Sequence, residues 1–110
     1  MSVKNEPNGN YFRISHRVVE HEKFKKLKPG AKVLYMILCH LRNRHGDEDG
    51  VFFRTDRKLA VDSGLNSDTI SKSKQELIRA GFLKWRKGGP RRACLYQIND
   101  KNSYVRKIST

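Results

Sequence analysis

The chain has 110 residues, and its 24 Lys and Arg against 11 Asp and Glu give a formal net charge of +13. That length fits one domain with a modest core, and the charge favours nucleic acid or an anionic membrane surface as the partner. No apolar run approaches the roughly 20 residues of a membrane span, and no signal pattern begins the chain. These features exclude a membrane-spanning or exported protein, so the cytoplasm is the expected compartment.

Charge and composition divide the chain into a core region and two tails. Residues 1–10 are polar and predict a flexible tail, and 100–110 predict a basic C-terminal tail, which leaves 11–99 as one domain. Residues 51–110 contain 14 basic and 5 acidic residues, whereas 1–50 contain 10 and 6. The binding surface is therefore expected in the second half of the chain.

The first half is expected to supply support and core. Residues 11–14 predict a short extended strand, and the apolar spacing over 15–27, with Ser15 as a cap, predicts a helix or two broken turns. A longer helix is predicted to have Pro29 in its first turn and to give way to a polar loop at 43–50. This helix carries a wide apolar face made of Ala31, Val33, Leu34, Tyr35, Ile37, Leu38 and Leu41.

Residues 55–83 contain two short helices separated by a glycine. The first is predicted over 56–63, because Thr55 can cap it and Gly64 can end it with a positive φ. The second follows a cap at Asn66 or Ser67, runs to Ala80 and stops at Gly81. Its buried stripe is expected to contain Ile70, Ser73, Leu77 and Ile78.

The spacing of small and apolar residues around this glycine is typical of a helix-turn-helix. Ala60 lies four residues before Gly64 and allows two helices to cross closely, and Ile70 lies six residues after it as an apolar anchor. An ordinary helical bundle is the alternative, since many helical hairpins turn on a glycine. The exposed face of the second helix offers hydrogen-bonding groups for base edges or phosphates, namely Ser67, Asp68, Ser71, Lys72, Gln75 and Arg79.

A basic hairpin is predicted directly after the second helix. The strand-like runs 82–85 and 94–98 flank a turn that contains two glycines and a proline. A brief strand at 51–54 is expected to complete a small antiparallel sheet with them. The order predicts an α+β, mainly α winged helix-turn-helix with three to four helices. Its wing would present cations that repel one another unless a polyanion lies opposite, namely Arg86, Lys87, Arg91 and Arg92.

Other residue clusters have simpler explanations. The acidic residues 47–49 lack the length and ligand periodicity of an EF-hand loop and predict a solvated turn. Cys39 and Cys94 predict small buried side chains rather than a CxxC pair, and the four histidines do not combine with them at zinc-ligand spacing. No catalytic or cofactor-binding motif is present, so the sequence predicts a non-enzyme without metal or cofactor.

These motifs together resemble the winged-helix domains of phage and plasmid replication initiators and organisers. The resemblance runs from YFRIS through LKPGAKVLYMIL, FRTDRKLAVDSGLNSDTISKS and ELIRAGFLKW to LYQI, and similar domains occur in bacterial regulators. It implies that the helix starting near Asn66 is the recognition helix and that the hairpin is a wing that reaches a phosphate backbone or the minor groove. Lys74 stands where an apolar residue is common in such helices. We also assign phosphate contacts in the preceding helix to Thr55, Arg57 and Lys58.

Three functions fit these observations. The first is sequence-specific binding of double-stranded DNA in replication or maintenance of a phage or plasmid, within a bacterial or phage-infected cell. The second is transcriptional regulation, which the lack of an evident inducer pocket weakens. The third is a protein-interaction winged helix with an acidic partner. The absence of acidic residues among the cations of the predicted wing loop weakens this hypothesis. A homodimer on DNA and replication or conjugation proteins are further partners to test. Because a full initiator carries another domain, we expect a DNA-binding fragment or a small accessory protein.

Overall fold

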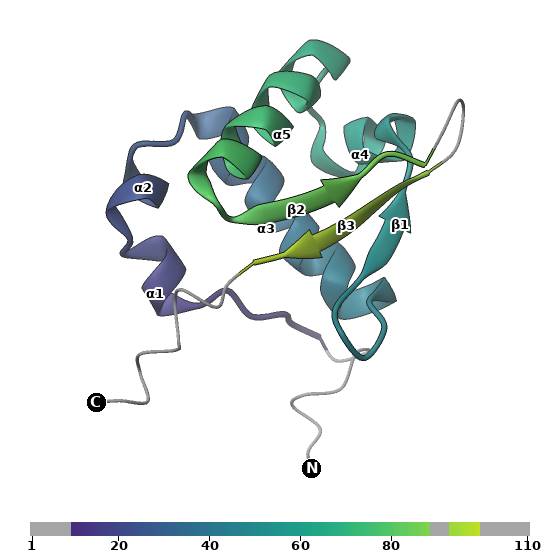
Figure 1. Ribbon diagram of the computed structural model, residues 1–110, viewed down its shortest axis with the longest axis horizontal. Helices are drawn as coiled ribbons and strands as arrows, with labels where there is room; N and C mark the ends of the chain where they lie inside the picture. The colour runs from purple at the N-terminus through teal and green to yellow at the C-terminus, as the bar shows by residue number, and fades with distance from the viewer. Residues whose placement is uncertain (1–9, 89–92, 100–110) are drawn as a thin grey trace.

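The computed structural model describes residues 10–88 and 93–99, which form five helices and three strands (Figure 1). This arrangement confirms the predicted mainly helical winged helix-turn-helix with its small antiparallel sheet. The five helices exceed the predicted three to four, because the segment before Pro29 forms two short helices. The elements in chain order are α1 (His16–Val19), α2 (Glu22–Lys25), α3 (Pro29–His45), β1 (Phe52–Arg54), α4 (Asp56–Ser63), α5 (Ser67–Ala80), β2 (Leu83–Arg86) and β3 (Cys94–Ile98).

Helix α3 forms the centre of the core. Pro29 begins it, as expected for a residue that has no backbone N–H to leave unpaired in the first turn. The helix continues through His45, so the polar loop predicted from residue 43 begins later than expected. In Figure 1 the sheet lies in front of α3 and α5 runs above β2. The buried side chains of α3 are Ala31, Leu34, Tyr35, Leu38, Cys39 and Leu41.

The sheet has the order β1-β3-β2 and is antiparallel throughout. Tyr96 at the centre of β3 lies opposite Phe52 of β1 and Trp85 of β2. Because side chains alternate between the two faces of a strand, these three residues share the face that covers the helices. Arg54 on the same face forms a two-bonded ion pair with Asp62, at 2.9 and 3.0 Å, which ties β1 to α4. The two predicted strands of the hairpin and the predicted strand before α4 are thus confirmed.

The segment before α3 departs from the prediction in one respect. Of the two alternatives for 15–27, the broken turns α1 and α2 are confirmed, with Ser15 as the cap of α1. The strand predicted at 11–14 was wrong, because no strand forms there. Phe12 packs instead against His40 of α3, with 5.4 Å between ring centroids. The segment therefore covers α3 rather than extending the sheet.

Helices α3 and α5 approach closely where α3 begins. A Cβ atom placed on Gly30 would lie 2.9 Å from Thr69 Cγ2 and 3.2 Å from Ser73 Oγ. The backbone N–H of Lys28 donates to Glu76 Oε2 at 3.0 Å beside this contact. We call this contact the α3–α5 seam. The predicted role of Ser73 as a small buried residue is confirmed.

The rest of the buried stripe of α5 differs from the prediction at one position. Ile70 and Leu77 are buried as expected, but Ile78 is 37% exposed, so its placement in the stripe was wrong. The 3.6-residue period puts Ile70, Lys74 and Leu77 on one side of the helix and places Ile78 at its edge. The buried stripe of α5 contains Lys74 instead of Ile78.

The turn between α4 and α5 has the predicted caps. Thr55 Oγ1 accepts from the Lys58 N–H at 3.1 Å, and Asn66 Oδ1 accepts from the Thr69 N–H at 2.8 Å. Gly64 ends α4 with φ of 77°, in the left-handed region that glycine occupies without steric cost. Both helix starts and the turn between them are therefore fixed by local hydrogen bonds and backbone geometry.

We predict that Gly64→Val destabilises the domain by about 1 to 3 kcal/mol, because a β-branched residue is strained at positive φ. The strain lies in the backbone alone, since nothing lies within 4 Å of an added Cβ. Urea unfolding followed by circular dichroism measures the loss. Gly64→Asn is the matched control, because asparagine tolerates the left-handed region, and it should lose much less stability. Equal losses in the two variants would place the cause outside the backbone conformation.

Candidate nucleic-acid interface

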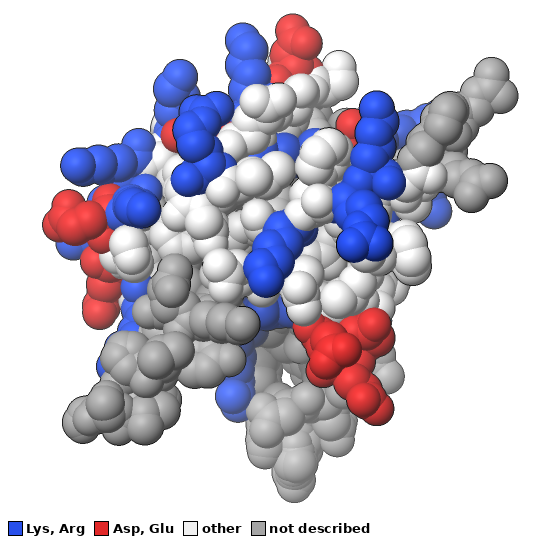
Figure 2. All heavy atoms as spheres, viewed as in Figure 1, with Lys and Arg blue, Asp and Glu red and all other residues white. Residues whose placement is uncertain are grey.

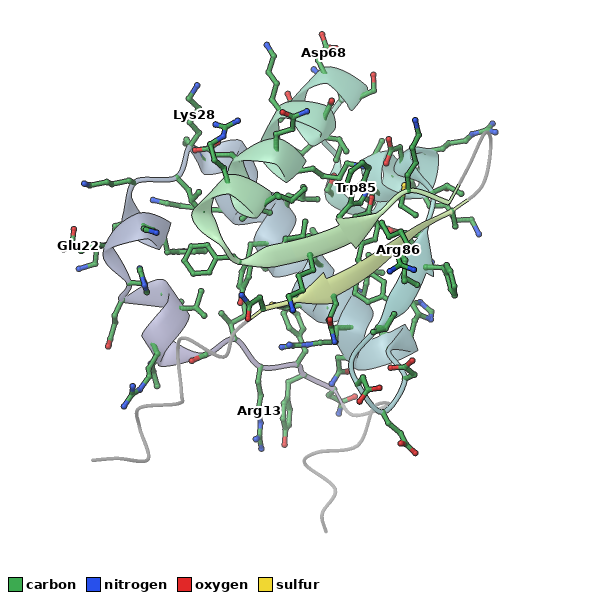
Figure 3. All side chains as sticks on the ribbon, viewed as in Figure 1. Arg13, Glu22, Lys28, Asp68, Trp85 and Arg86 are labelled. Carbon is green, nitrogen blue, oxygen red and sulfur yellow. The ribbon has the colours of Figure 1, made fainter. Side chains whose placement is uncertain are left out.

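Helix α5 presents a continuous polar face to solvent. All six residues predicted for this face are exposed, namely Ser67, Asp68, Ser71, Lys72, Gln75 and Arg79. Asp68 stands in the first turn, at the far end of α5 in Figure 3, where its negative charge complements the positive end of the helix dipole. Asn66, also predicted to read DNA, uses its side-chain oxygen as the helix cap, which leaves its amide N–H groups for a ligand.

The middle of this face is a ridge between two grooves. Ser71, Gln75 and Arg79, spaced one helical turn apart, line both. The first groove, of about 570 Å³, separates α5 from β2 and is here called the wing groove. The second, of about 600 Å³, separates α5 from the start of α3, where Lys28 stands. A helix flanked by hollows on both sides can enter a cleft in a partner without colliding with its own domain.

The structure divides the predicted wing cations between two faces. Lys87 lines the wing groove together with Trp85, whereas Arg86 lies on the opposite face of the sheet (Figure 3). Strand alternation is the cause, since Lys84 and Arg86 face away from the helices. Arg91 and Arg92 lie outside the described residues. Of the two wing cations that the structure describes, Lys87 is therefore the one that lies next to the polar ridge of α5.

Helix α4 supplies the remaining predicted contacts. Arg57 and Lys58 are exposed in its first turn, and neither lines a groove beside α5. The Thr55 hydroxyl accepts the capping bond and keeps its own hydrogen for a ligand. Figure 2 shows Lys and Arg spread across the upper part of the molecule, with one group of acidic side chains below, at the turn between α3 and β1, and others along the left edge and at the top. That turn is the exposed acidic segment 47–49, so its prediction as a solvated turn is confirmed.

Lys74 occupies a position whose role the sequence alone did not reveal. Its ammonium donates to Asp56 Oδ1 at 2.8 Å and to the Tyr96 hydroxyl at 3.0 Å. It also lies 5.4 Å from the ring centroids of both Trp85 and Tyr96, within the range of a cation–π contact. One side chain of α5 therefore joins the start of α4 and both strands of the hairpin.

The hydroxyl of Tyr96 completes this cluster. Burial raises the pKa of the Tyr96 hydroxyl well above its usual value, and the neighbouring Cys94 and Asp56 raise it further. The hydroxyl therefore stays protonated at neutral pH and can donate to Asp56 Oδ1, from which it lies 3.4 Å away. The mismatch of Lys74 with an apolar stripe was the only signal of the cluster in the sequence, because its partners lie 18 and 22 residues away.

Neither a metal site nor a membrane span accompanies this surface. Within residues 10–88 and 93–99, no three His, Cys, Asp or Glu side chains are grouped to hold a metal ion. No helix in the same part of the chain is long and apolar enough to cross a membrane. Cys39 and Cys94 are both buried, as predicted.

We predict that the aliphatic stem of Lys74 contributes more to stability than its charge. The side chain is 10% exposed but Asp56 is 56% exposed, so water can solvate the carboxylate once the ammonium is gone. Lys74→Met, which keeps the stem, should cost less than about 1 kcal/mol, whereas Lys74→Ala should cost about 2 kcal/mol or more by leaving a cavity. Urea unfolding compares the two. A methionine variant as unstable as the alanine variant would show that the ion pair dominates.

Comparison with known proteins supports the geometric interpretation. Residues 25–83 match a family model described as a helix-turn-helix domain. Two solved structures share the fold with TM-scores of 0.66 at 22% identity. One, described as the N-terminal domain of a DNA binding protein, aligns with 91% of this chain and 85% of its own, and the other, a Rep–DNA complex, with 90% and 82%. A search of curated proteins finds no match. Because the family match spans more than half of the chain, the chain belongs to the family of helix-turn-helix domains.

Proposed function

We propose that this domain binds double-stranded DNA sequence-specifically by inserting α5 into the major groove. The observation that carries the proposal is the exposed ridge of Ser71, Gln75 and Arg79 between two grooves. An α-helix with its side chains is about 10 to 12 Å across, which fits a major groove about 12 Å wide. The grooves beside the ridge leave room for the two strands that border the major groove.

The chemistry of the ridge favours base edges over phosphates. Ser71 and Gln75 are neutral, and a hydroxyl or a carboxamide can donate and accept hydrogen bonds. Asp68 locally offsets the charge of Lys72, so the face is not a plain cationic surface. Phosphate contacts are assigned to its surroundings, namely Thr55, Arg57 and Lys58 of α4 and the cations of the wing. Neutral side chains for base edges, surrounded by cations for phosphates, are typical of a protein that recognises a DNA sequence.

We further propose a role in replication or maintenance of a phage or plasmid, in the cytoplasm of a bacterial or phage-infected cell. This role is supported by the similarity of fold to a Rep–DNA complex, which extends over 90% of this chain. The proposed activity is binding without catalysis, and the proposed assemblies are a homodimer on DNA or a complex with replication proteins. Sequencing the DNA bound by the protein in its own host would decide the role. Repeated sites at an origin would support replication, and sites at promoters would support transcriptional regulation instead.

The proposal predicts a selective loss of affinity. After a preferred site is selected from random duplexes, Gln75→Ala or Ser71→Ala should weaken binding to that site by about 1 to 3 kcal/mol and leave random duplex nearly unaffected. Base contacts and phosphate contacts are separable contributions, which is why the two affinities should diverge. Fluorescence anisotropy at one fixed salt concentration measures both.

A matched control comes from the far side of the core helix. Met36 is an exposed neutral residue of α3 outside both grooves, so Met36→Ala should change neither affinity. If the α5 variants weaken specific and random duplex equally, or weaken neither, α5 does not read DNA. A protein-interaction role would then explain the surface better.

A further inference from the structure

The wing groove combines apolar and cationic walls. Ile78 of α5 and Trp85 of β2 are 37% and 42% exposed and line it together. Arg79 and Lys87 line it from the same two elements. A purely cationic surface would suffice for phosphate alone, so the apolar part of this groove points to a ligand that alternates apolar and anionic groups.

The indole of Trp85 contacts the protein on one side. The ammonium of Lys74 lies 5.4 Å from its ring centroid, and Tyr96 lies opposite it in the neighbouring strand. Figure 3 shows the side chain between β2 and α5. One part of the ring is therefore covered by the protein, while the rest forms an apolar surface in the groove.

The cations of the groove are available to an anionic ligand. Neither Arg79 nor Lys87 forms a salt bridge within the part of the chain that the structure describes. Among the described residues that line the groove, Asp56 is the only acidic one, and Lys74 already neutralises it at 2.8 Å. The electrostatic potential inside the groove is therefore positive, which suits a chain of phosphates.

The geometry of duplex DNA indicates which ligand the wing groove would hold. A strand of the sugar–phosphate backbone borders each side of the major groove, so a helix inserted there has one strand on either side. On the side that faces the sheet, that strand must pass between α5 and β2. We propose that the wing groove holds one backbone strand of the duplex, with Arg79 and Lys87 on consecutive phosphates and Trp85 against a deoxyribose. This inference rests on the proposed function and assigns to Trp85, Ile78 and Lys87 a shared site.

The single tryptophan of the chain gives a direct test. A fluorescently labelled duplex carrying the selected site is titrated with the protein, and anisotropy reports binding while acrylamide quenching reports access to Trp85. Bound duplex should protect Trp85, so quenching should fall towards that of a buried indole. Binding by anisotropy with unchanged quenching would overturn the groove assignment and leave the proposed function intact. An absence of binding would overturn both.

A pair of lysines on one strand gives a second, independent readout. Lys87 lies in the wing groove, whereas Lys84 lies on the outer face of the same hairpin. Lys87→Gln should lower the slope of log K against log salt by about 0.9, the value for one lost phosphate contact, and Lys84→Gln should leave it unchanged. Equal slopes for the two variants would overturn the assignment. Tighter binding and stronger protection by a single strand than by duplex would also overturn it, because the groove would then hold an unpaired base.

Discussion

The position of α5 depends on how closely this helix can approach the start of α3. At the α3–α5 seam a single methyl group on Gly30 would lie 2.9 Å from Thr69 Cγ2, closer than side-chain carbons pack. Ser73 fills the adjacent space, and Ile70 and Leu77 continue the contact into the core. Because packed interiors transmit volume changes rather than absorb them, any enlargement at the seam would push α5 outward. How far the α5 ridge stands out from the domain is thus set by the packing on the opposite face of the helix.

A second constraint fixes α5 from the side of the sheet. Lys74 interrupts the apolar stripe, yet its ammonium has two hydrogen-bond partners and two aromatic neighbours. Because a buried cation without partners would be strongly destabilising, the ammonium of Lys74 requires its hydrogen bonds to Asp56 and Tyr96. In return the cluster holds the α4 start and the β2–β3 hairpin at one distance from α5. The same cluster therefore sets the position of the α5 ridge relative to the wing groove.

The sequence predicted those parts of the domain that local rules control. Thr55, Gly64, Asn66 and Gly81 act on their nearest neighbours, so caps and turns followed directly from residue type. The periodic face of α3 likewise predicted the core. These features were enough to identify the helix-turn-helix and its exposed face.

Features that depend on distant partners were not predictable in the same way. The two hydrogen bonds of the Lys74 ammonium join residues of α5, α4 and β3, and the division of Arg86 from Lys87 depends on how β2 pairs with β3. The role of Gly30 depends on two side chains about forty residues later in the chain. The predicted burial of Ile78 was wrong because an edge position of a helix is buried or exposed according to what packs beside it. In each case the missing information is tertiary geometry, which no single-sequence pattern encodes.

Chemical interference on the bound site tests the central claim most directly, namely that α5 occupies the major groove. Dimethyl sulfate methylates guanine N7 in the major groove and adenine N3 in the minor groove. If the account is right, methylation of guanine N7 within the selected site blocks binding, and methylation of adenine N3 at the A·T pairs of the same site does not. If N7 methylation throughout the site leaves binding intact, α5 is not in the major groove and the account is contradicted.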